Sequence, residues 1–79
     1  MRNIIVNNIK KCLERKVKGL VIVHDNGKTL YIRIVYSSFE FKTKVENLTT
    51  LILNGYSSYD IGYDILQEYK NFLDSLFFI

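Results

Sequence analysis

The sequence predicts an α+β domain with the element order α-β-β-β-α-α, in which a three-stranded antiparallel meander is packed on one face by helices. Three observations support this fold: helical periodicity in residues 4–17, turn signals between β-branched runs in residues 20–45, and a long apolar stripe at helical spacing after residue 57. With 79 residues, the chain is expected to form a single domain, residues 1–79.

The first predicted element is an amphipathic helix over residues 4–17. Its apolar residues recur at spacings typical of one helix face, and lysines occupy the positions between them. Asn3 is the expected N-cap, and Gly19 is the expected left-handed residue after the last turn. Cys12 is on the apolar side, where an unpaired cysteine usually packs as a small hydrophobic residue.

Two turn signals divide residues 20–45 into three strands. Asn26-Gly27 favours a two-residue type I′ turn, which would place Val23 opposite Leu30. Ser37-Ser38 predicts a second two-residue turn. This register collects apolar residues on one face of the sheet: Val21, Val23, Leu30, Ile32, Ile34, Tyr36, Phe39, Phe41 and Val45, with Thr43. The opposite face then carries Ile22, His24, Thr29, Tyr31, Arg33, Val35, Glu40, Lys42 and Lys44.

Two helices are predicted after the meander. A short one covers Leu48–Leu53, with Asn47 as its N-cap. A long one follows, capped by Ser57 or Ser58, and the spacing from Ser57 to Asp60 nearly matches a capping box. Its apolar stripe comprises Ile61, Ile65, Leu66, Tyr69, Phe72, Leu73, Leu76 and Phe77.

No combination of residues indicates an enzyme. A single cysteine and a single histidine cannot form a structural zinc site, and no glycine-rich phosphate loop follows a strand. His24 has no evident partner for acid–base chemistry. The longest apolar run is four residues, against about 20 needed to span a bilayer. We therefore expect a cytoplasmic protein that acts by binding, with no metal, no cofactor and no membrane contact.

Charge is distributed unevenly along the chain. Residues 1–44 contain ten Lys/Arg and three Asp/Glu, which gives +7, whereas residues 45–79 contain one Lys and five Asp/Glu, which gives −4. This asymmetry predicts two surfaces of opposite sign. The alternative is that the charges serve only solubility.

The basic surface is predicted on the outward face of the sheet, where Tyr31, Arg33, Lys42 and Lys44 form a candidate nucleic-acid-binding site. Arg33 and Lys42 would sit opposite each other, and such a like-charge pair destabilises a sheet unless an anion binds. An aromatic ring among cations suits base stacking and phosphate contact. The alternative is that Glu40, diagonal to this pair, relieves the repulsion.

The acidic surface is predicted at the start of the long helix. Exposed tyrosines among carboxylates are typical of protein-binding hot spots, and carboxylates at helical spacing can replace phosphates in a basic groove. The alternative is that the tyrosines cover the edge of the core and the acids are merely solvated. The candidate protein-binding residues are Tyr56, Tyr59, Asp60, Tyr63, Asp64 and Glu68.

The chain also resembles a known family in its order of elements. A basic-ended helix (IKKCLERKVKG), an NG-turned meander (VIVHDNGKTLYIRIVYSSFEF) and acidic terminal helices (SSYDIGYDILQEY) are similar to those of small anti-CRISPR proteins, which phages and mobile elements use to inhibit Cas nucleases. The resemblance covers the whole chain as topology and includes no specific motif. Those inhibitors are acidic overall, whereas this chain has a net charge of +3. Mimicry of DNA would therefore involve only the acidic surface.

Three hypotheses of function follow. The first is a non-enzymatic phage or mobile-element inhibitor that docks on a host protein or ribonucleoprotein complex, such as a Cas effector, in the cytoplasm of a bacterial host. The second is an RNA- or DNA-binding protein that uses the basic sheet face. The third is an oligomerising adaptor, with a homodimer formed through the apolar C-terminal end, Leu76–Ile79.

Overall fold

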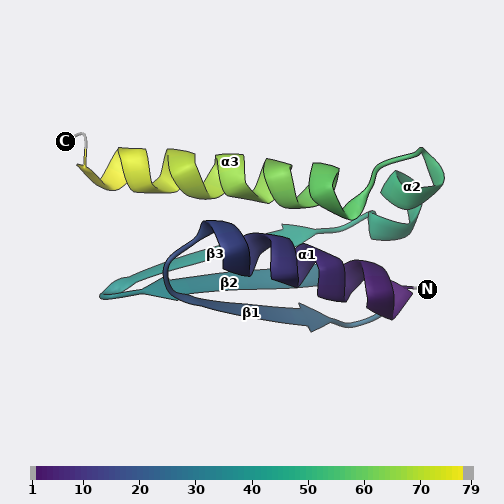
Figure 1. The fold of residues 1–79 in the computed structure, drawn as a ribbon, viewed down its shortest axis with the longest axis horizontal. Helices are drawn as coiled ribbons and strands as arrows, with labels where there is room; N and C mark the ends of the chain where they lie inside the picture. Colours follow the sequence, from purple (N-terminus) through teal and green to yellow (C-terminus); the bar gives the residue numbers. More distant parts are fainter. Residues whose placement is uncertain (1, 78–79) are drawn as a thin grey trace.

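The structure, a computed structural model, describes residues 2–77, and the side chains of residues 2–76. The elements are α1 (Arg2–Lys16), β1 (Leu20–Asp25), β2 (Leu30–Tyr36), β3 (Phe39–Val45), α2 (Leu48–Leu53) and α3 (Ser58–Phe77). The strands form one antiparallel sheet in the order β1-β2-β3. α1 packs on β1 and against α3, and α3 packs on β3 (Figure 1). The predicted fold class and element order are confirmed.

The core lies between the predicted apolar face of the sheet and the two long helices. Within this core, Ile32 and Ile34 of the central strand β2 are almost completely buried. The Phe41 ring contacts the rings of Tyr69 and Phe72, with centroids 5.4 and 5.3 Å away. Among residues 2–76, the buried apolar residues are Ile9, Leu13, Val21, Leu30, Ile32, Ile34, Phe41, Leu48, Ile61, Ile65 and Tyr69.

The predicted register of the first hairpin is wrong by two residues. Asp25 pairs with Leu30, and Val23 therefore pairs with Ile32 rather than with Leu30. A type I′ turn needs two residues with positive φ, and in this loop only Gly27 has one. The turn consists of Gly27 and Lys28 instead, because the N–H of Asn26 donates to the Thr29 carbonyl at 3.2 Å. The Asn26 side chain supports this turn, since its Oδ1 accepts the N–H groups of residues 28 and 29 at 2.9 and 2.7 Å. A shift of two keeps every side chain on its predicted face.

The second hairpin has the predicted register. Tyr36 pairs with Phe39, and Arg33 lies directly opposite Lys42. Ser37 has a φ of +56°, which the two-residue turn requires.

The start of α1 differs from the prediction. The helix begins at Arg2, so Asn3 is a helical residue rather than the N-cap. The guanidinium of Arg2 makes two hydrogen bonds to the Asp25 carboxylate, at 2.7 and 2.9 Å, and a third to Thr49 at 3.0 Å. These bonds hold the first turn of α1 against the end of β1 and the start of α2, an anchor that sequence spacing does not reveal.

The C-terminal end bears on the predicted homodimer contact. Residues 78 and 79, and the side chain of residue 77, lie outside the described residues. The homodimer through Leu76–Ile79 therefore stays a prediction. Among the helices in residues 2–77, none combines the length and the hydropathy needed to cross a membrane.

Candidate protein-binding groove

The beginning of α3 is organised by a capping box. Ser57 Oγ accepts the N–H of Asp60 at 3.2 Å, and the Asp60 carboxylate accepts the N–H of Ser57 at 2.8 Å and its hydroxyl at 3.0 Å. These hydrogen bonds lower the pKa of Asp60, the bond from the Ser57 N–H most of all. The predicted capping box is confirmed, and one of the candidate binding carboxylates therefore has a structural role as well.

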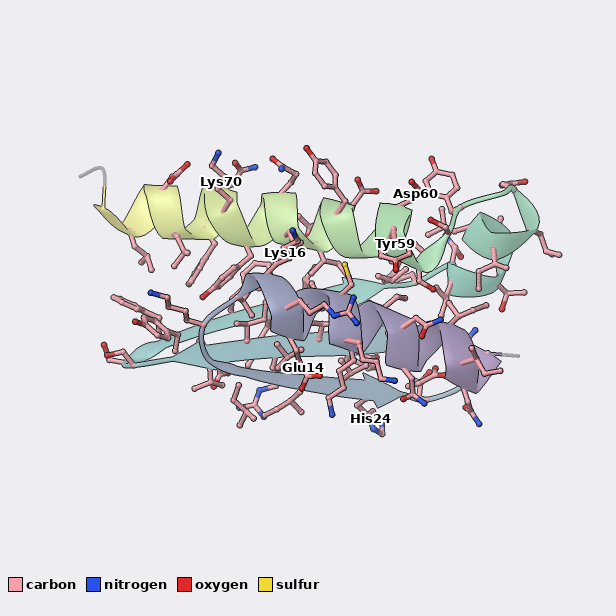
Figure 2. The ribbon with its side chains drawn as sticks, viewed as in Figure 1. Glu14, Lys16, His24, Tyr59, Asp60 and Lys70 are labelled. Atoms are coloured by element: carbon pink, nitrogen blue, oxygen red, sulfur yellow. The ribbon has the colours of Figure 1, made fainter. Side chains whose placement is uncertain are left out.

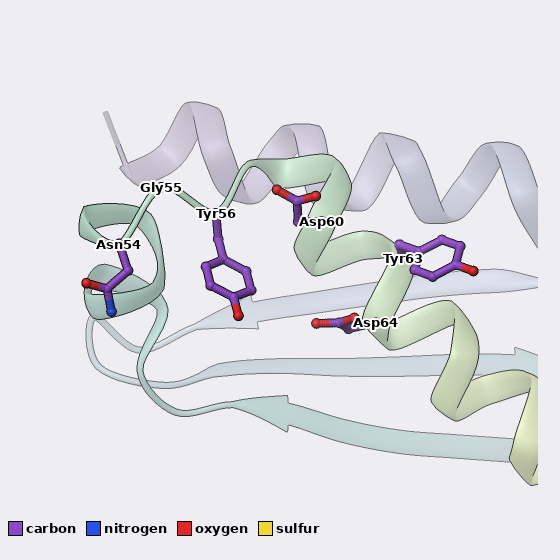
Figure 3. Close-up of a pocket in the computed structure, with 6 residues that line it drawn as sticks. All are labelled: Asn54, Gly55, Tyr56, Asp60, Tyr63 and Asp64. Atoms are coloured by element: carbon purple, nitrogen blue, oxygen red, sulfur yellow. The ribbon is translucent and has the colours of Figure 1, made fainter.

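A groove of about 440 Å³ lies between this helix start and the α2–α3 loop. Gly55, with a φ of +93°, reverses the chain after α2, and the following residue is held by an N–H bond to the Leu51 carbonyl at 3.0 Å. Figure 3 shows the Tyr56 ring and the Asp64 carboxylate directed into the same space. The lining residues are Asn54, Gly55, Tyr56, Asp60, Tyr63 and Asp64.

The groove is open and polar, and one carboxylate in it forms no hydrogen bond or salt bridge within residues 2–77. Tyr56 is 44% exposed and Tyr63 is 61% exposed. The Asp64 side chain makes no hydrogen bond and no salt bridge to any residue in the range 2–77. A carboxylate between two exposed tyrosines can accept a Lys or Arg side chain, and each ring offers a face for cation–π contact.

Two of the six predicted protein-binding residues lie outside this groove. Tyr59 faces α1 and lines a separate small pocket with Lys11 and Arg15, so its surroundings are basic (Figure 2). Glu68 lies on the β3 side of α3, where it accepts the Thr43 hydroxyl at 2.6 Å. Glu68 is still a neighbour of the groove, because it lines an adjacent pocket together with Asp64, whereas Tyr59 belongs to a different side of the helix. Asn54 and Gly55 were missed as lining residues because their sequence signal, a helix-closing Asn-Gly pair, indicates only a turn.

The predicted basic surface is compensated by its own acids. Glu40 forms salt bridges with both Arg33 (2.9 Å) and Lys42 (3.1 Å), and Lys44 pairs with Glu46 at 2.9 Å. The hydrogen bond from Arg33, followed by that from Lys42, lowers the pKa of Glu40. The alternative in which Glu40 relieves the repulsion therefore describes this face. Its charge is low, although its four residues do lie on one outward surface.

An aromatic pair remains on the outward face. The rings of His24 and Tyr31 stack with centroids 6.3 Å apart, and Tyr31 is 43% exposed. Figure 2 shows His24 on the side of β1 away from α1 and α3. Within residues 2–77, no salt bridge joins Asp60, Asp64 or Glu68 to the cations of this face. The acidic groove and the sheet are nevertheless adjacent at one place, because Asp64 and Glu68 line a pocket together with Lys44.

The described residues contain no group of three His, Cys, Asp or Glu side chains placed to hold a metal ion. No protein-family model, curated protein or solved structure matches the chain.

Proposed function

We propose that this protein acts by binding and that its acidic groove docks on a basic, nucleic-acid-binding surface of another protein. The unpaired Asp64 carboxylate carries this proposal, because it lies exposed between two tyrosines while the cations of the sheet face are already paired. Of the two predicted surfaces, the acidic one retains free charge for a partner.

The partner proposed first is a host nucleic-acid-handling complex of a Cas effector type, which the protein would inhibit by occupying a channel built for phosphates. The support is the order of elements and the groove itself. Nucleic-acid binding through the sheet face has less support, because Glu40 and Glu46 offset its cations.

A cleavage assay tests the proposal. A guide-loaded Cas nuclease is mixed with labelled target DNA and increasing amounts of the protein. We expect inhibition by the wild type and at least tenfold weaker inhibition by Asp64→Asn, since a groove carboxylate is lost without loss of a hydrogen bond within the fold. Asp74→Asn is the matched control, because it removes an exposed carboxylate from the same helix outside the groove.

Two results would overturn the proposal. If Asp64→Asn inhibits as well as the wild type, the groove is not the docking site. If the wild type binds the labelled DNA directly in a gel shift and does not bind the nuclease, the sheet face is the working surface instead.

A further inference from the structure

A second pocket lies between the end of α1, the turn that joins β2 and β3, and the C-terminal half of α3 (Figure 1). Its volume is about 350 Å³, which is within the range of about 300–1,000 Å³ that is usual for small-molecule sites. The acidic groove lies beside α2, at the other end of α3. The two sites are therefore formed by different parts of the molecule.

The walls of this pocket are apolar and mainly aromatic. Val17 and Leu73, which are partly buried against the core, supply aliphatic surface. The rings of Tyr36, Phe39 and Tyr69 supply the rest of the apolar wall. Aromatic rings attract another ring in offset-stacked or edge-to-face arrangements, in addition to the burial of apolar area. These walls therefore suit a ligand with a flat aromatic body.

The Tyr69 hydroxyl is a polar group within these apolar walls. The residue is only 8% exposed, and its hydroxyl forms no hydrogen bond to any residue in the range 2–77. Among the described residues, every completely buried side-chain oxygen or nitrogen has a hydrogen-bond partner, so the Tyr69 oxygen must open into the pocket that the residue lines. Burial, and then the neighbouring Tyr36, raise the pKa of Tyr69. The hydroxyl therefore keeps its proton at neutral pH and can donate a hydrogen bond to a bound acceptor.

Two lysines of the same pocket indicate that this acceptor is an anion. Lys16 and Lys18 are exposed and line the pocket, and neither forms a salt bridge within residues 2–77. The described residues that line the pocket include no Asp or Glu that could offset their charge. A carboxylate attached to an aromatic ring complements this arrangement, because the carboxylate accepts charge-assisted hydrogen bonds while the ring is removed from water.

We propose that this pocket binds a small aromatic carboxylate. The ring of the ligand packs between Leu73 and the aromatic walls. Its carboxylate accepts hydrogen bonds from the Tyr69 hydroxyl and from the ammonium group of Lys16 or Lys18. A flat ring also loses little conformational freedom on binding, in contrast to a flexible alkyl chain. The site does not depend on the function of the acidic groove, whose charge is opposite.

NMR titration of the intact protein tests this site, with 2-naphthoate as the probe. We expect saturable binding and nuclear Overhauser contacts between the naphthalene ring and the methyl groups of Val17 and Leu73. Two further compounds separate the features of the ligand: 2-naphthamide keeps the ring without the charge, and decanoate keeps the carboxylate on a flexible chain. Each should bind at least tenfold more weakly, because the first loses the contact between charges and the second loses the ring contacts and its own freedom. If naphthoate does not bind, or if either compound binds within tenfold of it, the proposal is overturned.

Variants of the protein test the same contacts from the other side. Tyr69→Phe keeps the ring and removes the hydroxyl, so naphthoate should bind at least fivefold more weakly. The double variant Lys16→Gln/Lys18→Gln should weaken naphthoate binding at least tenfold and change 2-naphthamide binding less than twofold, a difference that damage to the fold would not produce. Lys70→Gln is the matched control, since Figure 2 shows this lysine on the side of α3 away from the sheet, and it should bind like the wild type. Circular dichroism checks that the variants fold, and unchanged naphthoate binding by the double lysine variant would refute the proposal.

Two other occupants of the pocket would be recognised by different results. If Phe78→Ser binds naphthoate and the wild type does not, the end of the chain itself fills the pocket. If sedimentation shows a wild-type dimer that Tyr36→Ser dissociates, and naphthoate binds neither protein, the pocket belongs to an interface between two copies. Either result would refute the binding of an aromatic carboxylate.

Discussion

Gly62 lies inside α3 at the point where this helix crosses α1. Its backbone is helical, so a side chain there meets no backbone strain, but a Cβ would lie 3.0 Å from Cys12 Sγ and 3.4 Å from Cys12 Cβ. We therefore predict that the effect of Gly62→Ala depends on residue 12. Alanine gains about 1 kcal/mol over glycine in a helix interior. Forcing an extra methyl group into a packed contact lowers the free energy of unfolding by about 1–3 kcal/mol.

These two terms set the expected result. In the wild type, Gly62→Ala should lower the free energy of unfolding by about 1 kcal/mol, because the clash exceeds the propensity gain. In Cys12→Ala, which alone loses about 1 kcal/mol, only the Cβ contact at 3.4 Å remains. There, Gly62→Ala should raise stability by about 1 kcal/mol. The two residues should thus show a coupling of about 2 kcal/mol.

Urea denaturation of the four proteins at pH 7 measures this cycle. A change of 1 kcal/mol corresponds to about 4–8 °C in Tm for a domain of this size, so thermal melts provide a second reading. If Gly62→Ala changes stability equally in both backgrounds, within about 0.5 kcal/mol, the close approach of α1 and α3 at this position is refuted.

Three further predictions concern the ends of elements. Ser57→Ala removes the side chain of the capping box, so the free energy of unfolding measured in urea should fall by about 1 kcal/mol. Ser57→Asn keeps a capping oxygen, so its free energy of unfolding should stay within a few tenths of a kcal/mol of the wild type. The Arg2 guanidinium lowers the pKa of Asp25 below its ordinary value of 3.8, so this pair stabilises the fold above that pH and its contribution is lost as the pH falls further. Arg2→Gln should therefore have a free energy of unfolding roughly 1 kcal/mol lower than the wild type at pH 7, and thermal melts should show this difference shrinking below about pH 3.8. In Gly19→Ala, the new Cβ would lie 2.5 Å from a backbone carbonyl oxygen, so the free energy of unfolding should fall by roughly 3 kcal/mol or more. In Gly27→Ala, the Cβ meets no atom within 4 Å, and the fall should be only about 1–2 kcal/mol. Equal losses of stability in thermal melts would contradict the close approach at Gly19.

Much of the candidate groove could be predicted from the sequence, and its limits could not. Asp60, Asp64 and Tyr63 belong together because residues three and four apart share a helix face. The same spacing placed Tyr59 and Glu68 on the predicted surface, but the helix turns them toward α1 and β3. Tyr59, which is 71% exposed, and Glu68 both stay exposed, but the neighbouring elements decide which surface each of them joins.

The sheet shows a similar division. Alternating side chains predicted which residues face the core, since a strand has a fixed period of two. The loop that joins β1 and β2 was not predictable from the Asn-Gly pair, because the outcome depended on the Asn26 side chain bonding its own backbone. Likewise, the opposition of Arg33 and Lys42 followed from register, but the position of the Glu40 carboxylate between them is a property of the folded surface.

The amino-acid sequence alone determined the number, type and order of the elements and which face of each strand is apolar, because periodicity and turn chemistry act over short stretches of chain. Only the tertiary structure decided which charges remain free and which contacts require a glycine. From the sequence, Gly62 is simply a weak helix residue. In the fold, a Cβ at this position would lie 3.0 Å from Cys12 Sγ, and that proximity joins residues fifty positions apart.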